Sequence, residues 1–207
     1  MNKIDRKIYD NLDILPEDLQ GWNGKSKLFG QLIDEIRPKT IIEVGTWKGQ
    51  SAINMGTSVV DLNLNTKIFC VDTWLGAVEF LTTLSHTPER NLLLKNGYPQ
   101  IYYQFLSNVV HRGLEDYILP IPNTSENGFR FLKSNNIIAE MIYIDASHEE
   151  DDVYKDICNY YELLSYGVIF GDDYTSWVGV KNAIDRFVFE KKLNLEIIEN
   201  NFWLIRK

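Results

Sequence analysis

The chain has 207 residues, of which 44% are hydrophobic and 13% aromatic. This length and composition fit one ordinary globular domain and exclude a disordered or fibrous chain. The formal net charge of -8 opposes binding to nucleic acids, and no apolar stretch approaches the roughly 18 residues of a membrane-spanning helix. We therefore expect a single cytoplasmic domain over residues 1–207, with neither a nucleic acid nor a membrane as partner.

Short apolar runs alternate with longer amphipathic segments along the chain. Helical spacing over residues 28–36 ends at Pro38, and an apolar run over 40–45 then ends on glycine. A helix over 50–60 and a strand over 67–72 complete a β-α-β unit, whose strands pair in parallel through a right-handed crossover. We predict five further strands, over residues 117–121, 141–145, 168–171, 195–198 and 202–205.

The later part of the chain completes the predicted sheet. Amphipathic stripes that include Val153 and Val180 predict helices, and only residues 199–201 separate the last two strands, which must form an antiparallel hairpin. The expected fold is α/β, a doubly wound, Rossmann-like, seven-stranded sheet that is mostly parallel and ends in a C-terminal antiparallel hairpin. Residues 73–113 exceed one crossover, and we expect a helical insertion whose aromatic residues pack onto the sheet or cap the active site.

A glycine loop follows the first strand directly. Its glycines, Gly45 and Gly49, are four residues apart, unlike the three-glycine dinucleotide pattern, in which a bulky residue such as Trp47 would obstruct the pyrophosphate. With Glu43 in the strand, the pattern resembles motif I of class I methyltransferases; a structural turn is the alternative. The resemblance implies that the loop and the start of the helix contact S-adenosylmethionine through Glu43, Gly45, Thr46, Trp47, Gly49 and Ser51.

Two later strand ends supply further candidate contacts to this cofactor. Asp72 ends the second strand, where the fold places an acid that accepts hydrogen bonds from the ribose hydroxyls. The alternative is an ordinary aspartate that begins a turn. We include Thr73, which follows it, and Ser125, which resembles the family's serine near the adenine.

Three carboxylates follow two neighbouring strands. Asp145 closes the strand over 141–145, and Asp172 and Asp173 follow the strand over 168–171. Parallel strands lie about 4.8 Å apart and end at the same edge, so these acids would repel one another unless a divalent cation such as Mg²⁺ lay between them. Both acids of the pair can converge only if the chain leaves the strand there. Otherwise one of them is a solvated turn residue.

The same segments carry a more specific resemblance. Residues 144–148 and 167–174, followed by Trp177 and Gly179, look like the metal-dependent small-molecule O-methyltransferases related to the macrocin O-methyltransferase group. Together with the glycine loop and Asp72, the match extends over residues 40–187, except for the insertion. It implies that Mg²⁺, bound by Asp145, Asp172 and Asp173, holds two substrate oxygens, and that a homo-oligomer is possible.

The general base is less clearly marked. Some relatives carry a second acid two residues after the first, but here that position is Ser147, which also fits a capping box with Glu150. His148 would then lie in the first helical turn, where the helix dipole keeps an imidazole neutral, as a base requires. We predict His148 and Asp145 as catalytic residues, with a polar cap role for His148 as the alternative. His86 and His111 are expected in solvated loops.

The expected activity is methyl transfer from S-adenosylmethionine, assisted by Mg²⁺, to a small hydroxylated acceptor such as a sugar, a phenol or a natural product. The alternatives are a metal-independent methyltransferase and a non-catalytic protein on the same fold that either binds S-adenosylmethionine or has a structural role. Methylation of nucleic-acid amino groups is disfavoured, since residues 145–148 lack the Asx-Pro-Pro-aromatic element of those enzymes. A nicotinamide oxidoreductase is disfavoured by the two-glycine loop.

Overall fold

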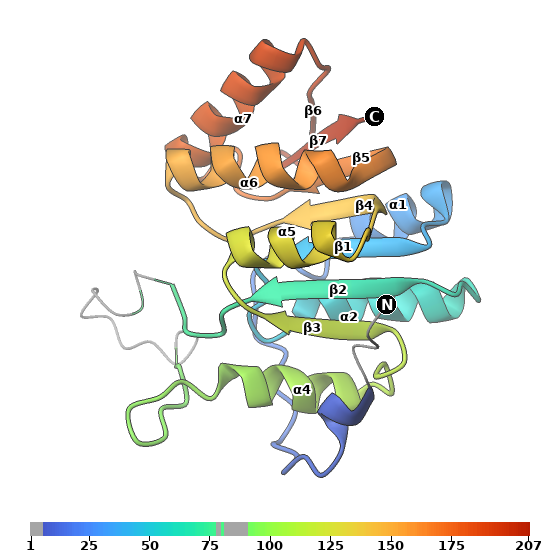
Figure 1. Ribbon diagram of the computed structural model, residues 1–207, viewed down its shortest axis with the longest axis vertical. Coiled ribbons are helices and arrows are strands. Elements are labelled where there is room, and N and C mark those ends of the chain that lie inside the picture. The colour runs from blue at the N-terminus through green and yellow to red at the C-terminus, as the bar shows by residue number, and fades with distance from the viewer. Residues whose placement is uncertain (1–5, 78–79, 81–90) are drawn as a thin grey trace.

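The computed structural model describes residues 6–77, 80 and 91–207, which form a seven-stranded sheet with helices on both faces (Figure 1). The strand order is β3-β2-β1-β4-β5-β7-β6. The strands are β1 Thr40–Val44, β2 Lys67–Asp72, β3 Ile118–Pro122, β4 Ala139–Ile144, β5 Leu164–Gly171, β6 Glu196–Ile198 and β7 Phe202–Arg206. The first five pair in parallel, and β7 is antiparallel to both β5 and β6. The predicted doubly wound fold with its C-terminal hairpin is confirmed.

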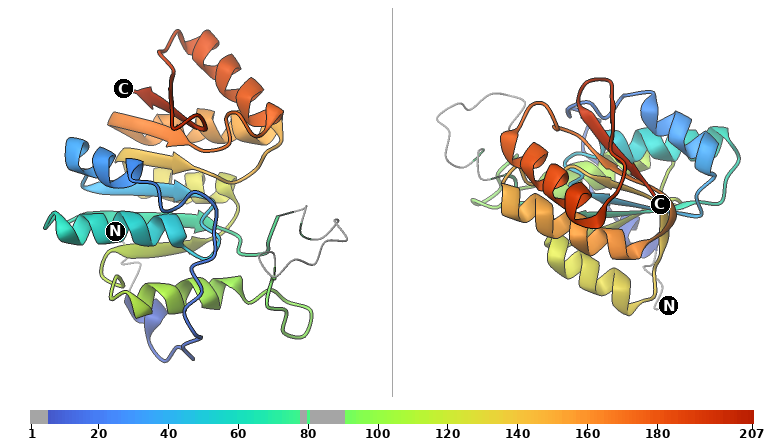
Figure 2. Two further views of the ribbon diagram at one scale, coloured as in Figure 1. Left: turned by 180° about the vertical axis from the view of Figure 1, so that it is seen from behind. Right: turned by 90° about the horizontal axis from the view of Figure 1, so that it is seen from above.

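The helices pack on the two faces of the sheet over separate apolar cores (Figure 2). One core holds residues of α1 Leu28–Ile36, α2 Gln50–Asp61 and α4 Ile101–His111, and the short 3₁₀-helix η1 Arg6–Tyr9 lies on the same side. The other core holds residues of α5 Ser125–Ser134, α6 Glu150–Leu163 and α7 Val178–Lys191. Neighbouring residues of a strand serve opposite cores, as Ile41 and Ile42 do in β1. This two-sided burial explains why the central strands are continuous apolar runs.

The strand register brings three chain exits together at one edge of the sheet. Val44 pairs with Ile144, and Ile144 pairs with Gly171, so the last residues of β1, β4 and β5 are adjacent. The strand order also reverses here, because β2 lies on one side of β1 and β4 on the other. In open α/β sheets such a reversal leaves a crevice at the carboxyl ends of the strands, where ligands bind.

One strand boundary and one missed helix differ from the sequence prediction for local reasons. Strand β5 begins at Leu164, four residues earlier than predicted, because α6 runs into it without a loop. Helix α5 was not predicted: its buried face consists only of Gly128, Phe129 and Leu132, too few apolar positions for a clear helical stripe. Its N-cap, Thr124, accepts a hydrogen bond from the backbone N–H of Asn127. None of the helices within the described ranges could cross a bilayer.

The long segment between β2 and β3 contains the crossover helix α4. Trp74 and Phe105 are buried, with ring centroids 4.9 Å apart, so they pack onto the sheet as predicted. His111 is the last residue of α4, and its Nε2 lies 2.8 Å from the carbonyl oxygen of Leu15; the prediction of a loop position was wrong because the helix extends to it. His86 lies outside the described residues.

Candidate active site

The glycine loop after β1 is in backbone contact with the end of β4. Gly45 has a φ of 83°, and a Cβ atom placed there would lie 1.9 Å from the carbonyl oxygen of Asp145. Gly49 also has a left-handed φ, of 88°, and a Cβ atom there would lie 2.8 Å from the ring of Phe105. Only glycine combines these φ values with such close approach. The two glycines therefore fix the loop tightly against its surroundings.

Asp72 holds this loop from the neighbouring strand. One oxygen of its carboxylate accepts hydrogen bonds from the backbone N–H groups of Thr46 and Trp47, each at 2.8 Å. The other oxygen accepts one from the N–H of Trp74 at 2.7 Å. Asp72 therefore lies beside the loop, as predicted, and stabilises its conformation; contact with a ribose stays a prediction.

Glu43 and Ser51 lie beneath the loop. The side chain of Glu43 has no exposed surface, accepts a hydrogen bond from the Ser51 hydroxyl, and lies 3.4 Å from Cys70 Sγ. Burial raises the pKa of Glu43 to about 8. Neither side chain reaches the surface of the loop, so any effect of Glu43 and Ser51 on a cofactor acts through the loop itself.

The remaining predicted cofactor contacts are spread around the same edge. Thr46 is buried in the loop, whereas Thr73 is exposed and its hydroxyl accepts a hydrogen bond from the N–H of Leu75 at 3.2 Å. Ser125 is the first residue of α5, and its carbonyl oxygen accepts a hydrogen bond from the Tyr160 hydroxyl at 2.8 Å. Strand β3 ends opposite Asp72, because Asp72 pairs with Pro122. Ser125 therefore begins its helix near Asp72.

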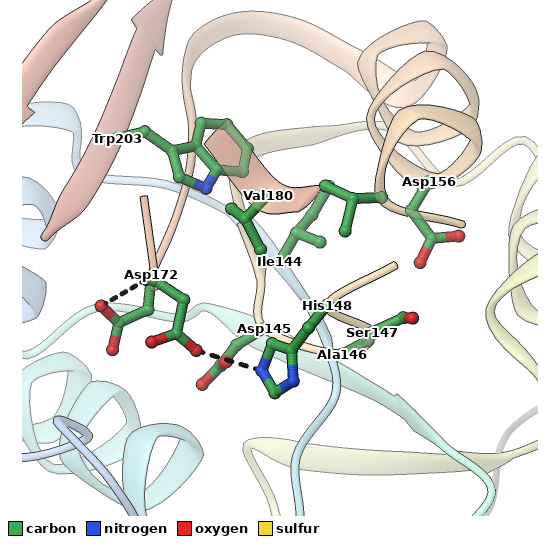
Figure 3. Close-up of a pocket in the computed structure, with 11 residues that line it drawn as sticks. Ile144, Asp145, Ala146, Ser147, His148, Asp156, Asp172, Val180 and Trp203 are labelled. Atoms are coloured by element: carbon green, nitrogen blue, oxygen red, sulfur yellow. Dashed lines mark hydrogen bonds and ion pairs between the residues drawn. The ribbon is translucent and has the colours of Figure 1, made fainter. Parts of the chain in front are cut away.

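Asp145 follows β4 and lies near Asp172, which follows β5 (Figure 3). Its carboxylate accepts a hydrogen bond from the buried hydroxyl of Tyr143 at 3.0 Å. Burial, and then the negative charges of Asp172 and Asp173, raise the pKa of Asp145 to about 7. The chain leaves the strand after Gly171, and Asp145, Asp172 and Asp173 line one cavity at this edge. Their predicted convergence on a shared metal ion stays a prediction.

The carboxylate of Asp172 is held by hydrogen bonds from amide groups. Its side chain accepts hydrogen bonds from Asn23 Nδ2 at 2.8 Å, from the backbone N–H of Asp173 at 2.7 Å, and from Asn201 Nδ2. Only 5% of the residue is exposed. Burial raises the pKa of Asp172, while these N–H donors oppose the rise. The donors come from the segment before α1 and from the β6–β7 turn, so two distant segments meet on this carboxylate.

His148 is held in place from two sides. Its Nε2 lies 3.2 Å from an oxygen of Asp173, and its ring is stacked on Trp177 with centroids 4.2 Å apart and planes 3° apart. A small cavity of about 10 Å³, room for one water-sized group, lies beside it. The residues that line it include Asp145, Ser147, His148, Asp156, Asp172 and Asp173 (Figure 3).

Residues 42–174, more than half of the chain, match the family described as a methyltransferase domain. The chain belongs to this family. The predicted class I S-adenosylmethionine-dependent methyltransferase is thereby confirmed at the level of enzyme class. No curated protein sequence matches the chain.

Solved structures share the fold of this methyltransferase. The O-methyltransferase NovP has a TM-score of 0.69 at 15% identity, over 87% of this chain and 78% of NovP. An O-methyltransferase from Bacillus cereus in complex with SAH has a TM-score of 0.60 at 14% identity, over 97% and 88% of the two chains. TomG from Streptomyces achromogenes, an O-methyltransferase of tomaymycin synthesis in complex with SAM, has a TM-score of 0.61 at 13% identity, over 93% and 82%. At these identities the likeness concerns the fold alone.

In this methyltransferase, helix α6 begins later than the sequence predicted. The helix starts at Glu150 with Glu149 as N-cap, so Ser147 is not the cap and His148 lies before the first turn. The Ser147 hydroxyl accepts from the N–H of Glu149 and donates to Asp152, which draws it away from a capping position. The helix-dipole argument for a neutral His148 therefore does not apply; the contacts with Asp173 and Trp177 fix the ring instead.

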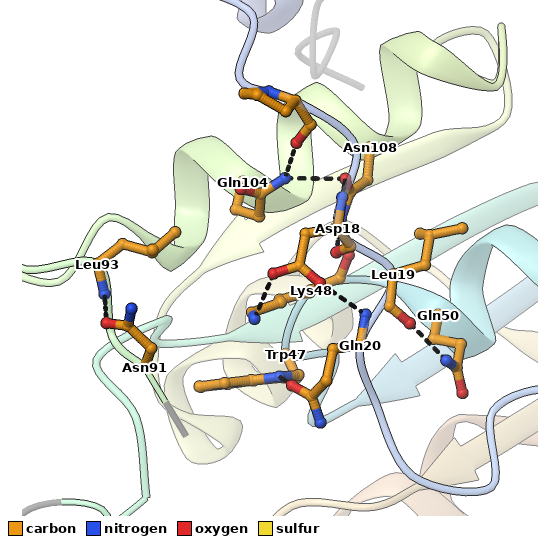
Figure 4. Close-up of polar contacts among 11 residues, drawn as sticks. Asp18, Leu19, Gln20, Trp47, Lys48, Gln50, Asn91, Leu93, Gln104 and Asn108 are labelled. Carbon is orange, nitrogen blue, oxygen red and sulfur yellow. Dashed lines mark hydrogen bonds and ion pairs between the residues drawn. The ribbon is translucent and has the colours of Figure 1, made fainter. Parts of the chain in front are cut away.

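Residues 15–26, which we call the N-terminal strap, contribute contacts that the sequence did not reveal (Figure 4). Asp18 forms an ion pair with the buried ammonium group of Lys48 at 2.7 Å, and Gln20 accepts a hydrogen bond from the indole N–H of Trp47 at 3.0 Å. The side chain of Asn108 on α4 accepts a hydrogen bond from the N–H of Asp18 and donates one to its carbonyl oxygen. The strap has no apolar periodicity, so no sequence pattern marked it as part of the site.

Proposed function

We propose that this methyltransferase transfers the methyl group of S-adenosylmethionine to a hydroxyl oxygen of a small acceptor, such as a sugar, a phenol or a natural product. The observation that carries the proposal is the contact between Gly45 and Asp145. It sets the glycine loop, residues 45–49, which we call the cofactor loop, directly beside Asp145, Asp172 and Asp173, which we call the acidic edge. One side of this junction offers backbone N–H groups and close approach for the donor. The other offers carboxylates and an imidazole that suit a hydroxyl group.

The cofactor half rests on the glycine loop and its supports. Residues 46 to 49 turn tightly with positive φ at Trp47 and Gly49, and α2 begins immediately after them. The exposed N–H groups of a helix N-terminus favour a carboxylate such as that of the methionine part of the cofactor. In this proposal Asp72 accepts hydrogen bonds from the ribose hydroxyls through lone pairs that its three N–H donors do not use. Ser125 lies toward the adenine.

The catalytic half requires alignment of a hydroxyl oxygen and removal of its proton, because the sulfonium group already activates the methyl carbon. His148 is the base in this proposal. In the tautomer that donates from Nε2 to Asp173, Nδ1 carries the lone pair that takes the proton. Asp173 and Trp177 orient the ring, so that the single proton of the acceptor hydroxyl is donated to His148 Nδ1, and the negative charge of Asp145 stabilises the imidazolium that forms.

Metal assistance is a finer part of the proposal. Three carboxylates on one edge form a donor set that suits a hard divalent ion, and their mutual repulsion, which raises the pKa of Asp145, is what a cation would relieve. Asp145, Asp172 and Asp173 would hold Mg²⁺, which when bound would polarise the acceptor hydroxyl. Within the described ranges, however, no three acidic, histidine or cysteine side chains are already arranged as a metal site.

One observation favours a metal-independent methyltransferase as the second candidate. Both oxygens of Asp172 already accept hydrogen bonds from N–H groups, of Asn23, Asp173 and Asn201, which stabilise the carboxylate without a cation. The two candidates share the cofactor and differ only in their response to divalent ions. Chelation separates them directly.

The first test is calorimetry on metal-stripped protein, titrated with S-adenosylmethionine and then, as the cofactor complex, with Mg²⁺. We expect micromolar cofactor binding and a separate Mg²⁺ isotherm that Asp145→Asn removes and Glu162→Gln, an exposed surface change, leaves intact. Absence of cofactor binding would overturn the proposal in favour of a non-catalytic protein. Cofactor binding with no Mg²⁺ isotherm, and methyl transfer insensitive to chelator, would support the metal-independent candidate.

Other sequence expectations stay predictions. A small-molecule acceptor is supported by the site, and the net charge of -8 opposes a nucleic-acid partner. Homo-oligomer formation, the lack of a membrane partner and a cytoplasmic location are among these predictions. Gel filtration with light scattering would establish the oligomeric state.

A further inference from the structure

The N-terminal strap joins the two halves of the site. Near its middle it contacts the cofactor loop, through Asp18 with Lys48 and Gln20 with Trp47. Near its end, Asn23 donates to Asp172, and Ser26 donates to Glu199 in the β6–β7 turn at 2.8 Å. A residue between Gln20 and Asn23 is therefore held between the loop and the acidic edge.

Trp22 occupies this position, and 49% of it is exposed. Its ring lies 6.1 Å from the ring of Trp47 and 6.2 Å from that of Phe80, with planes tilted by 43° and 34°. Neither neighbour lies flat on the indole, whereas His148 covers Trp177 in parallel at 4.2 Å. Trp22 thus presents a large exposed indole next to Trp47 of the cofactor loop, and the residue that follows it, Asn23, donates a hydrogen bond to Asp172 at the acidic edge.

An indole face suits a particular ligand chemistry. Aromatic rings stack on it, and the apolar C–H face of a sugar ring can pack on it in the same way, while its edge tolerates water. Ligand sites commonly combine such apolar walls with a few polar groups that fix orientation. Here such polar groups are adjacent, since the carboxylate of Asp172 accepts a hydrogen bond from the side chain of Asn23, the residue after Trp22.

We propose that Trp22 is the residue on which the ring of the acceptor stacks, and that the acceptor is a hydroxylated six-membered ring, aromatic or sugar. The ring lies on the indole while its hydroxyl points to the acidic edge. Specificity then depends on the strap as well as on the sheet edge. This inference rests on the proposed function, because it assumes that the acceptor is methylated at that edge.

The test uses the full chain loaded with S-adenosylhomocysteine and two probes that carry neighbouring hydroxyl groups, catechol and methyl α-D-glucopyranoside. Saturation-transfer NMR reports ring protons that touch the protein. We expect a signal from at least one probe with the wild-type chain, and a loss of at least fivefold in Trp22→Ala. Trp22→Phe should keep most of it, and Phe189→Ala, which removes an exposed ring on α7, should keep all of it.

Cofactor affinity separates the possible failures. Calorimetry with S-adenosylhomocysteine should give the same affinity, within threefold, for the wild-type chain and all three variants, which also shows that they fold. If the wild-type chain does not bind it, the proposed function itself fails. If it binds but neither probe gives a signal, or if Trp22→Ala leaves the signal unchanged, the assignment of Trp22 is wrong while the methyltransferase proposal stands. The probe that gives the signal distinguishes an aromatic from a sugar acceptor.

Discussion

Among the glycines, Gly45 has the least room for a side chain. Because its Cβ atom would lie 1.9 Å from the carbonyl oxygen of Asp145 and its φ is 83°, Gly45→Ala must displace either the loop or the end of β4. We expect a loss of more than about 4 kcal/mol in the free energy of unfolding, measured in urea, or failure to fold. Gly113→Ala is the matched control, since its φ is 63° but nothing lies within 4 Å, and it should cost only about 1 kcal/mol. Similar losses in both variants would contradict the packing argument.

The buried carboxyl group of Glu43 predicts a pH dependence of stability. Its pKa is about 8 in the folded chain and 4.5 without burial, so between these values the folded state binds the proton more tightly than the unfolded state. Its contribution to stability is therefore complete below the lower value and is lost as the pH rises through 8. Urea unfolding from pH 5 to 8.5 should show a fall in stability that is smaller in Glu43→Gln.

Asp145 also makes the stability fall as the pH rises, because its pKa is raised as well, to about 7. The Glu43→Gln profile should therefore be flatter than that of the wild-type chain without being level. Glu162→Gln changes an exposed carboxylate and should keep the wild-type slope. A Glu43→Gln slope equal to that of the wild-type chain would show that Glu43 is ionised in the folded state.

At the scale of elements, the strap depends on an ion pair with unequal burial. The side chain of Lys48 is 2% exposed and that of Asp18 is 42% exposed. Asp18→Asn leaves a buried ammonium group without its counter-charge and should cost about 3–5 kcal/mol, whereas Lys48→Met leaves a solvated carboxylate and should cost about 1–2 kcal/mol. Urea unfolding of the two variants measures the difference.

The exposed pair of Arg112 with Glu17 is the control for this comparison, because it joins the same strap to the end of α4 at 2.6 Å. Exposed ion pairs contribute little, so Arg112→Gln should change the stability by less than about 1 kcal/mol. If Lys48→Met proved more destabilising than Asp18→Asn, the burial of Lys48 would not be the reason for the asymmetry.

The sheet elements were predictable from the sequence, whereas parts of the site were not. Continuous apolar runs, which buried parallel strands produce, predicted the first five strands, and the short spacing over 199–201 predicted the antiparallel hairpin of the last two, each to within a few residues. Asp72 and the three carboxylates were found because strand ends in a parallel sheet share an edge. Asn23 and Asn201 were missed, since a carboxamide in a turn has no pattern that reveals which distant carboxylate it will bond. Helix α5 was missed because its buried face is small.

At the scale of the whole molecule, two apolar cores share one sheet, which bears on the predicted single domain. Phe29 lies in one core and Phe187 in the other, both fully buried. If the chain unfolds as one cooperative unit, Phe29→Ala and Phe187→Ala should each lower the stability by about 3–5 kcal/mol and keep a single transition. Separate transitions by fluorescence and circular dichroism in either variant would indicate two units.

The contact between Gly45 and Asp145 joins main chain to main chain across one hundred residues of sequence. The spacing between the bound donor and the acidic edge is thus set by the backbone, and substitutions elsewhere in the site leave it unchanged as long as Gly45 is kept. In the proposed function, changes in the strap and in the β6–β7 turn would alter the fit of the acceptor without altering this spacing. The backbone contact between Gly45 and Asp145 would stay the same while the sequences of the strap and the turn change.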